Sequence, residues 1–471
     1  MRILARRIAA SLALVTLPAA PAHAAALVDG TSLSLLWGVP FAGILLSIAL
    51  FPVLAGKFWH HHYPKVSLAW ALAFLVPFAA VYGPDVAGAA LFAVTALEYL
   101  PFIIMLFALF VVSGGIHIGG RLAGTPGVNA AMLAIGTILA SFIGTTGAAM
   151  LLIRPMIAAN ATRQRKVHIF VFFIFLVGNI GGSLTPLGDP PLFLGFIKGI
   201  DFFWTMKAMA GPMFVTSIIL IAAFFVIDSI FYRAEAVAGK RNDTAPNRIT
   251  IEGGINFLFL ALVIAAVLLS GIYANLANVK LFGTYVPVES IARNVVLLVI
   301  AWAAYRLTPA PLRAKNQFSW EPIREVAILF IGIFVTIIPV IAILAAGTQG
   351  AAAEAVRLVS DENGAPVNLM YFWLTGGLSA FLDNAPTYLV FFNLAGGDPA
   401  TLMGPLSSTL LAISMGAVFM GAFTYIGNAP NFMIKAICEE RGIAMPSFFG
   451  FIGWSAVFLL PVFALVSSLF L

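Results

Sequence analysis

Residues 185–193 read TPLGDPPLF, and residues 424–432, which lie 239 positions later, read TYIGNAPNF. Threonine, glycine, proline and phenylalanine recur at equivalent places in the two stretches. A second pair has the same offset, because FIGTTGAAMLL begins at Phe142 and FLDNAPTYLVF begins at Phe381. Two pairs of stretches with one offset indicate an internal duplication, which determines the architecture of the chain.

The composition indicates a membrane protein. Hydrophobic residues make up 61% of the chain, charged residues 9%, and the mean hydropathy is +1.03. A soluble protein has about 25% charged residues, so this chain has too few charges to cover a surface in water. The net charge of +6 is expected from basic loops on one side of a lipid bilayer and does not indicate nucleic-acid binding. We expect an all-α integral membrane protein.

The first residues are typical of a signal peptide. Residues 1–24 combine basic residues, a short apolar core and the A-x-A sequence Ala22-His23-Ala24. An uncleaved first helix is the alternative. Cys438 is the only cysteine, so no internal disulfide can form. We therefore expect a bacterial inner-membrane protein whose mature amino terminus lies outside.

Ten stretches have the length and hydropathy to cross a bilayer as helices, for which about 20 apolar residues suffice. They are 33–55, 66–83, 95–118, 169–197, 209–232, 254–274, 290–307, 323–345, 403–437 and 447–470. Two more apolar stretches, 127–160 and 369–395, are interrupted midway by GTTG and DNAP. Each is too long for one span, so both are expected to be re-entrant hairpins. Irregular backbone at that depth requires cover by protein or by a watery cavity.

These segments predict an inverted repeat. The predicted parts are a signal peptide (1–24), a first transmembrane helix and loop (25–65), repeat 1 (66–232), a basic loop with a linking helix (233–289) and repeat 2 (290–471). Each repeat contains one hairpin and one broken helix, at 169–197 and 403–437. With this threading sixteen basic residues, including Arg163, lie in inside loops, and five, including Lys198 and Arg293, lie in outside loops, as the positive-inside rule requires.

Inverted repeats with broken helices are typical of secondary transporters, whose solute site lies at the membrane midplane. Pro190 and Pro191 remove backbone donors and Gly188 tolerates a turn, so the first broken helix is expected to open there. A simple kink is the alternative. Carbonyls and amides freed at such a break can bind ions.

Two acidic residues are expected near the middle of the membrane, Asp189 and Asp383. A carboxylate there costs at least about 2.5–3.5 kcal/mol, so both are candidate cation or proton sites. The alternative is that each caps its own helix. Neutral oxygen ligands suited to sodium surround them, or else form helix-packing hydrogen bonds. These candidates are Thr145, Thr146, Asn179, Ser183, Thr185, Asn384, Thr387, Thr424 and Asn428.

Three other features are interpreted as peripheral. Glu98 is expected near the outer end of its span, in a vestibule. Arg154 is expected to extend to the inner surface, with anion binding as the alternative. The three histidines at 60–62 are expected in a hydrated loop, rather than at a metal site.

Three motifs resemble the ion transporter superfamily: GNIGGSLTPLGDPPLFLGF (178–196), FLDNAPTYLVFFNLAGGD (381–398) and GAFTYIGNAPNFM (421–433). The chain is most similar to the bacterial sodium:proton antiporter-like branch, which is grouped with citrate-transporter-like proteins. The resemblance covers the chain from about residue 33 to its end. It implies a scaffold domain, a moving transport domain with two opposed hairpins, and a homodimer.

The resemblance also helps to choose between cation exchange and carboxylate symport as the function. Dicarboxylate symporters of this superfamily have a Ser-Asn-Thr pattern at the hairpin tips, whereas this chain has GTTG at 144–147 and DNAP at 383–386. The charge of Asp383 would repel citrate, which favours a cation. We expect a non-enzymatic antiporter of sodium and protons that uses no cofactor besides the sodium ion. A sodium- or proton-coupled symporter of citrate or another small carboxylate is the alternative. An intramembrane aspartyl protease and a channel are less favoured, because neither explains duplicated broken helices.

Overall fold

The computed structural model describes residues 29–237, 247–274 and 277–471. The expected signal peptide at 1–24 lies outside the described residues. Within them, eight helices are long and apolar enough to cross a membrane, and a bent pair forms a ninth. The predicted all-α integral membrane fold is therefore confirmed. The predicted spans 169–197 and 403–437 are missing from this set, because each is divided into shorter helices.

The candidate spans have these limits in the structure. They are Leu35–Leu54 (η3, Leu35–Gly38, with α2, Val39–Leu54), Gly56–Tyr82 (α3), Pro84–Ser113 (α4, Pro84–Val94; η4, Thr95–Tyr99; α5, Leu100–Ser113), Pro126–Ile143 (α6), Phe202–Glu235 (within α10, Phe202–Val237), Ile255–Ile272 (α11), Val288–Leu307 (α12) and Phe448–Phe470 (α22). The bent pair consists of α14 (Glu321–Thr336) and α15 (Ile338–Ala345), which meet at an angle of 42°.

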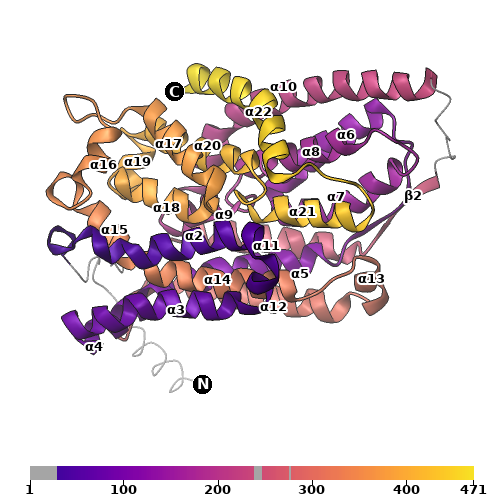
Figure 1. Ribbon diagram of the computed structural model, residues 1–471. Coiled ribbons are helices and arrows are strands. Elements are labelled where there is room, and N and C mark those ends of the chain that lie inside the picture. The colour runs from indigo at the N-terminus through magenta and orange to yellow at the C-terminus, as the bar shows by residue number, and fades with distance from the viewer. Residues whose placement is uncertain (1–28, 238–246, 275–276) are drawn as a thin grey trace, which may run out of the picture.

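Helices α2–α5, α11, α12 and α14 pack together as a first bundle, which fills the lower half of Figure 1. Close packing of α3 on α14 depends on Gly332, since a Cβ there would lie 2.3 Å from Ser67 Oγ. Short elements connect these helices. They are η2 (Gly30–Ser32), β1 (His117–Arg121) paired antiparallel with β2 (Asn247–Glu252), the hairpin of β3 (Asn278–Leu281) and β4 (Thr284–Pro287), and α13 (Ala310–Lys315).

The remaining helices form a second bundle, in the upper half of Figure 1, which includes α10 and α22. It contains two helix pairs, α6 with α7 (Thr145–Ala159), and α17 (Asn368–Phe381) with α18 (Asn384–Leu394). It also contains two interrupted helices. These are α8 (Val167–Leu176), η5 (Ile180–Ser183) and α9 (Pro190–Ile197), and α20 (Ser407–Met420), η7 (Gly421–Phe423) and α21 (Ala429–Glu440). Shorter connections are η6 (Gly347–Gln349), α16 (Ala353–Leu358) and α19 (Pro399–Met403).

The helix pairs have nearly the limits expected for the hairpins, 127–160 and 369–395. In the first pair the chain turns at Gly144, whose φ of +79° is unfavourable for any residue with a side chain. The turn lies against the first break, because Thr145 N–H donates to Gly188 O at 2.9 Å. Gly188 is itself closely packed, since a Cβ there would lie 2.2 Å from Gly182 O.

Several sequence expectations need correction. The histidines at 60–62 lie within helix α3, not in a loop, because α2 and α3 are separated only by Ala55. The third span starts at Pro84 rather than 95, so Glu98 lies at its middle and not near its outer end. The expected domain boundaries after residues 65, 232 and 289 fall inside α3, α10 and α12.

Candidate functional site

Four segments of the second bundle meet at Asp189, whose exposed fraction is 1%. Thr145, at the first hairpin tip, donates its hydroxyl to Asp189 Oδ1 at 3.0 Å. Asn428, at the second break, donates Nδ2–H to the same oxygen at 2.9 Å. Asn384, at the second hairpin tip, donates Nδ2–H to Oδ2 at 2.5 Å. Both carboxylate oxygens are therefore held by side chains from the other three segments.

Equivalent hydrogen bonds shape the two breaks. The Thr185 hydroxyl donates to Ser141 O, and the Thr424 hydroxyl, 239 positions later, donates to Ala380 O. In each break a backbone N–H two residues further on donates to the threonine oxygen at 3.2 Å. The two threonines therefore hold each break against its own hairpin. They were predicted as ligands, but their hydroxyl groups already have these partners.

Within the described part of the chain, no basic side chain donates a hydrogen bond to the Asp189 carboxylate. Among the described residues, the side chains that donate to its carboxylate are two asparagines and one threonine. A buried carboxylate is costly unless it is paired or hydrogen-bonded, and neutral donors offset only part of that cost. The site is therefore suited to a small cation or a proton, which would supply the missing charge.

Helix termini also converge on this place. Four helices begin at the two tips and the two breaks, namely α7, α9, α18 and α21. The preceding segments α6, η5, α17 and η7 end there. Starting helices present free amides and a partial positive charge, while ending helices present free carbonyls. The same small volume can therefore bind a cation through carbonyls and an anion through amides.

Asp383 has a different role in the structure. Its Oδ1 accepts a hydrogen bond from Ala385 N–H at 3.0 Å, so the side chain caps α18. The residue is half-buried and directly precedes Asn384. Of the two alternatives for Asp383, helix capping is thus observed. A contribution of its charge to cation binding at Asp189 stays a prediction.

The remaining candidates lie around this centre. Asn179 donates Nδ2–H to Asn431 Oδ1 at 2.7 Å, and its Oδ1 accepts from Asn428 Nδ2 at 3.2 Å. Ser183 donates to Ile180 O within its own turn. Thr146 is half-buried, next to the first tip. Thr387 donates to the carbonyl of the residue four positions before it. Asn179 is thus connected to the centre, whereas Ser183 serves its own backbone.

Asn431 belongs to the site and was not predicted. Its Nδ2 donates to Gly421 O and to Thr424 O, each at 2.8 Å, which fixes the second break. The only signal in the sequence is a polar residue directly after Pro430, the second residue of α21. Its contact with Asn179, 252 positions away, depends on the tertiary fold.

Arg154 does not simply extend into water. Its Nη2 donates to Gln317 Oε1 in the first bundle at 2.9 Å, and the residue is half-buried. Nε and Nη1 are buried and have no hydrogen-bond partner in the described part of the chain. Among the described residues, which include the histidines at 60–62, no group of three or more potential metal ligands is found.

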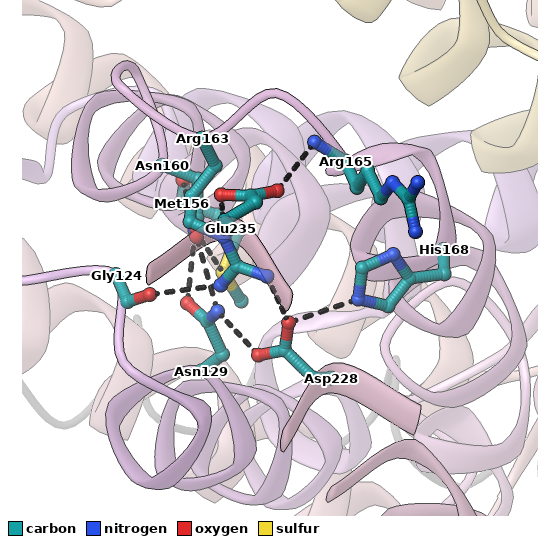
Figure 2. Close-up of polar contacts among 9 residues, drawn as sticks. All are labelled: Gly124, Asn129, Met156, Asn160, Arg163, Arg165, His168, Asp228 and Glu235. Carbon is teal, nitrogen blue, oxygen red and sulfur yellow. Dashed lines mark hydrogen bonds and ion pairs between the residues drawn. The ribbon is translucent and has the colours of Figure 1, made fainter. Parts of the chain in front are cut away.

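A second polar cluster lies at the base of the first hairpin (Figure 2). Arg163 donates to Asp228 Oδ1 at 2.7 Å and to Glu235 Oε2 at 3.1 Å. His168 Nε2 lies 2.9 Å from the same oxygen of Asp228. The side chains of Arg163 and Asp228 are almost fully buried, with exposed fractions of 2% and 0%.

Two asparagines extend this cluster into the hairpin. Asn129 on α6 and Asn160 after α7 exchange side-chain hydrogen bonds at 2.8 and 3.0 Å, and Asn129 donates to Asp228 Oδ2 at 2.9 Å. Both ends of the hairpin are thereby fixed to α10. Arg163 lies between α7 and α8, in the loop where it was expected, but its burial and its partners in this cluster were not predicted. Asp228 and Glu235, seven positions apart and so on one helix face, were the available signal.

The fold and the two breaks around a buried site define the class of the protein, which is a multi-pass membrane transporter. Residues 30–471 match the model of a family described as "Putative citrate transport". The chain belongs to this family, which bears out the resemblance to the citrate-transporter-like branch. The search of curated proteins found no match.

Proposed function

We propose that this transporter exchanges sodium for protons, and that Asp189 is the group which binds either cation. One observation carries the proposal. Asp189 is a buried carboxylate at the meeting point of two hairpin tips and two breaks, and the side chains that donate to it in the described structure are neutral. An unpaired charge at that depth marks a functional site by default.

Competition at one site would couple the two flows. A carboxylate binds a proton or a sodium ion, and each lowers the affinity for the other. Asn384 and Asn428 now present N–H groups to the carboxylate. A half-turn of either amide would present its carbonyl oxygen instead, as sodium requires. The same side chains thus suit both the empty and the loaded site.

Symport of citrate or a related carboxylate is the second candidate. The family description favours it, and so do the four helix amino termini at the site, which offer amides to an anion. In that case sodium or a proton on Asp189 would first neutralise the site. Exchange is placed first because Asp383 adds a second carboxylate beside the tip, while basic side chains among the described residues do not contact Asp189.

Transport in proteoliposomes separates the two candidates. An imposed sodium gradient is applied to reconstituted protein with and without citrate, while a dye reports internal pH. Exchange predicts proton movement in the absence of citrate and no accumulation of labelled citrate. Proton movement that requires citrate, together with citrate uptake, would contradict exchange and establish symport.

We further propose that the protein lies in a bacterial inner membrane, with the end that carries Arg163 and Arg313 in the cytoplasm. The excess of basic residues in loops at that end supports this orientation. Gln164 and Glu362 are exposed and suit single-cysteine labelling in intact cells. A cysteine at 362 should react with an impermeant reagent and one at 164 should not. The reverse pattern would overturn the orientation.

A further inference from the structure

A buried ion pair joins the two bundles at a distance from Asp189. Lys198 Nζ donates to Glu98 Oε1 at 2.6 Å, and the two side chains have exposed fractions of 5% and 6%. Glu98 lies in η4 of the first bundle, and Lys198 directly follows α9 of the second. The contact therefore crosses between helix bundles and is shielded from water.

The local structure around both Glu98 and Lys198 favours the ion pair between them. Segment η4 is a π-helical turn in the middle of the span Pro84–Ser113, and such turns are frequent at functional places in helices. Lys198 is the C-cap residue of α9, where the helix dipole favours a positive charge. Its charge is thus stabilised from two directions while the pair is intact.

Helix α9 connects this pair to the candidate cation site. Asp189 is its N-cap residue and Lys198 its C-cap residue, about 13 Å apart along the axis at about 1.5 Å per residue. The same helix meets a further cation of the first bundle. The guanidinium of Arg293 lies 6.0 Å from the ring centroids of Phe193 and Phe196. A displacement of α9 at the site would therefore act directly on the contact between the bundles.

We propose that the Glu98–Lys198 pair is a latch, which holds the second bundle against the first in this conformation and opens when the second bundle moves. Its link to the cation site rests on the function proposed above, in which ion binding at Asp189 acts on the latch through α9.

The hydrogen bonding of the pair favours a reversible contact over a permanent one. Glu98 Oε2 is buried and has no hydrogen-bond partner among the described residues. A buried ion pair with an unsatisfied oxygen stabilises a fixed interface poorly, and apolar residues would serve better there. The pair does make separation unfavourable, because each partner left alone would be a buried charge. A contact that stabilises an interface only weakly, but resists separation, is suited to forming in one conformation and breaking in another.

The latch is tested by measuring the distance between the bundles in the full chain in lipid nanodiscs. Spin labels are placed on cysteines at Asp85 in α4 and Ala400 in α19, which are both exposed, while Cys438 is buried. The variant E98Q/K198M removes both charges and leaves no lone buried charge, so folding is preserved. The ratio of latched to displaced populations should fall by about tenfold or more.

Two further variants make the result specific. The control K435M/E439Q removes an ion pair within the single helix α21 and should leave the distances unchanged. The exchanged variant E98K/K198E restores an attractive pair and should return the distances toward those of wild type. Distances in E98Q/K198M equal to those of wild type would overturn the latch. Failure of the exchanged variant to restore them would also overturn it, since packing rather than charge would then hold the bundles.

Sodium titration keeps this test separate from the proposed function. If the latch exists but sodium does not bind at Asp189, E98Q/K198M changes the distances while sodium has no effect on wild type. If sodium binds but the latch is wrong, sodium changes the wild-type distances while E98Q/K198M behaves as wild type. A wrong latch and a wrong sodium site therefore give different combinations of distance changes.

Discussion

Asn428 donates a hydrogen bond to Asp189 Oδ1 at 2.9 Å, and the 239 positions between these two residues are the offset of the internal duplication itself. Equivalent positions of two repeats can touch only close to the axis that relates the repeats. Asp189 therefore lies at the centre of the duplicated structure, and one of the two equivalent positions carries a charge while the other carries an amide. The amide can donate to that charge through its nitrogen or coordinate a bound cation through its oxygen, whereas a second ionised carboxylate could coordinate the cation but could not donate.

The charge of Asp383 should modulate sodium binding without being essential. Asp383→Asn keeps a good N-cap for α18 but removes a charge next to Asn384. Exchange should persist, and the sodium concentration for half-maximal exchange should rise by about tenfold, which corresponds to about 1.4 kcal/mol. Sodium-dependent exchange in proteoliposomes measures it.

Asp398→Asn is the matched control, because Asp398 caps α19 in the same way away from the site. Identical sodium dependence in the two variants would show that Asp383 is only a helix cap.

The breaks should tolerate no side chain at their glycines. A Cβ at Gly188 would lie 2.2 Å from Gly182 O, and one at Gly427 would lie 2.6 Å from Gly421 O. Both neighbours are backbone atoms, so Gly188→Ala should lower the free energy of unfolding by about 1–3 kcal/mol and abolish transport. Gly453→Ala in α22, where a Cβ meets nothing within 4 Å, is the control for thermal melting and transport. Equal melting temperatures for the variants at 188 and 453 would disprove the close packing.

The cluster in Figure 2 should contribute strongly to stability. Arg163→Met leaves Asp228 and Glu235 as buried charges without their shared partner. The expected loss is about 3–5 kcal/mol in the free energy of unfolding, seen as a lower melting temperature in detergent. The corresponding change at the partly exposed pair Lys435–Glu439 of α21, Lys435→Met, should cost no more than about 1 kcal/mol. A melting temperature for Arg163→Met equal to that of the control would show that the cluster does not hold the hairpin.

The fold class was predictable because each membrane-spanning helix requires a long apolar stretch, which is easily recognised in the hydropathy of the sequence. The short or interrupted apolar stretches differ visibly from these. The limits of α6 with α7, and of α17 with α18, lie within a few residues of the predicted stretches, since glycine and proline mark the interruptions. The span around Glu98 was predicted to start too late because Pro84 and Asp85 are typical of a loop, whereas in the structure Pro84 is the first residue of α4 and Asp85 lies in its first turn.

The site was predictable in its residue types but not in its contacts. Asp189, Asn384 and Asn428 stood out as polar residues in apolar surroundings. The partners of Thr185 and Thr424 are backbone carbonyls 44 positions away, which a sequence pattern does not specify. Arg163, Lys198 and Arg293 were assigned to loops because basic residues usually mark them. In the structure each is buried against a partner from another helix.

The exchange activity of Asp189→Asn shows directly whether Asp189 is the group that binds sodium and protons. Asparagine keeps the size of the side chain and can still accept hydrogen bonds from Thr145 and Asn428, but it cannot bind a proton and carries no charge for sodium. The variant is reconstituted in vesicles beside wild type, with equal protein content and comparable thermal melting, and a sodium gradient is imposed while internal pH is recorded. If Asp189 binds both cations, sodium-driven proton movement should fall by at least about 100-fold, equivalent to about 2.7 kcal/mol. Exchange at the wild-type rate in Asp189→Asn would contradict this role of Asp189.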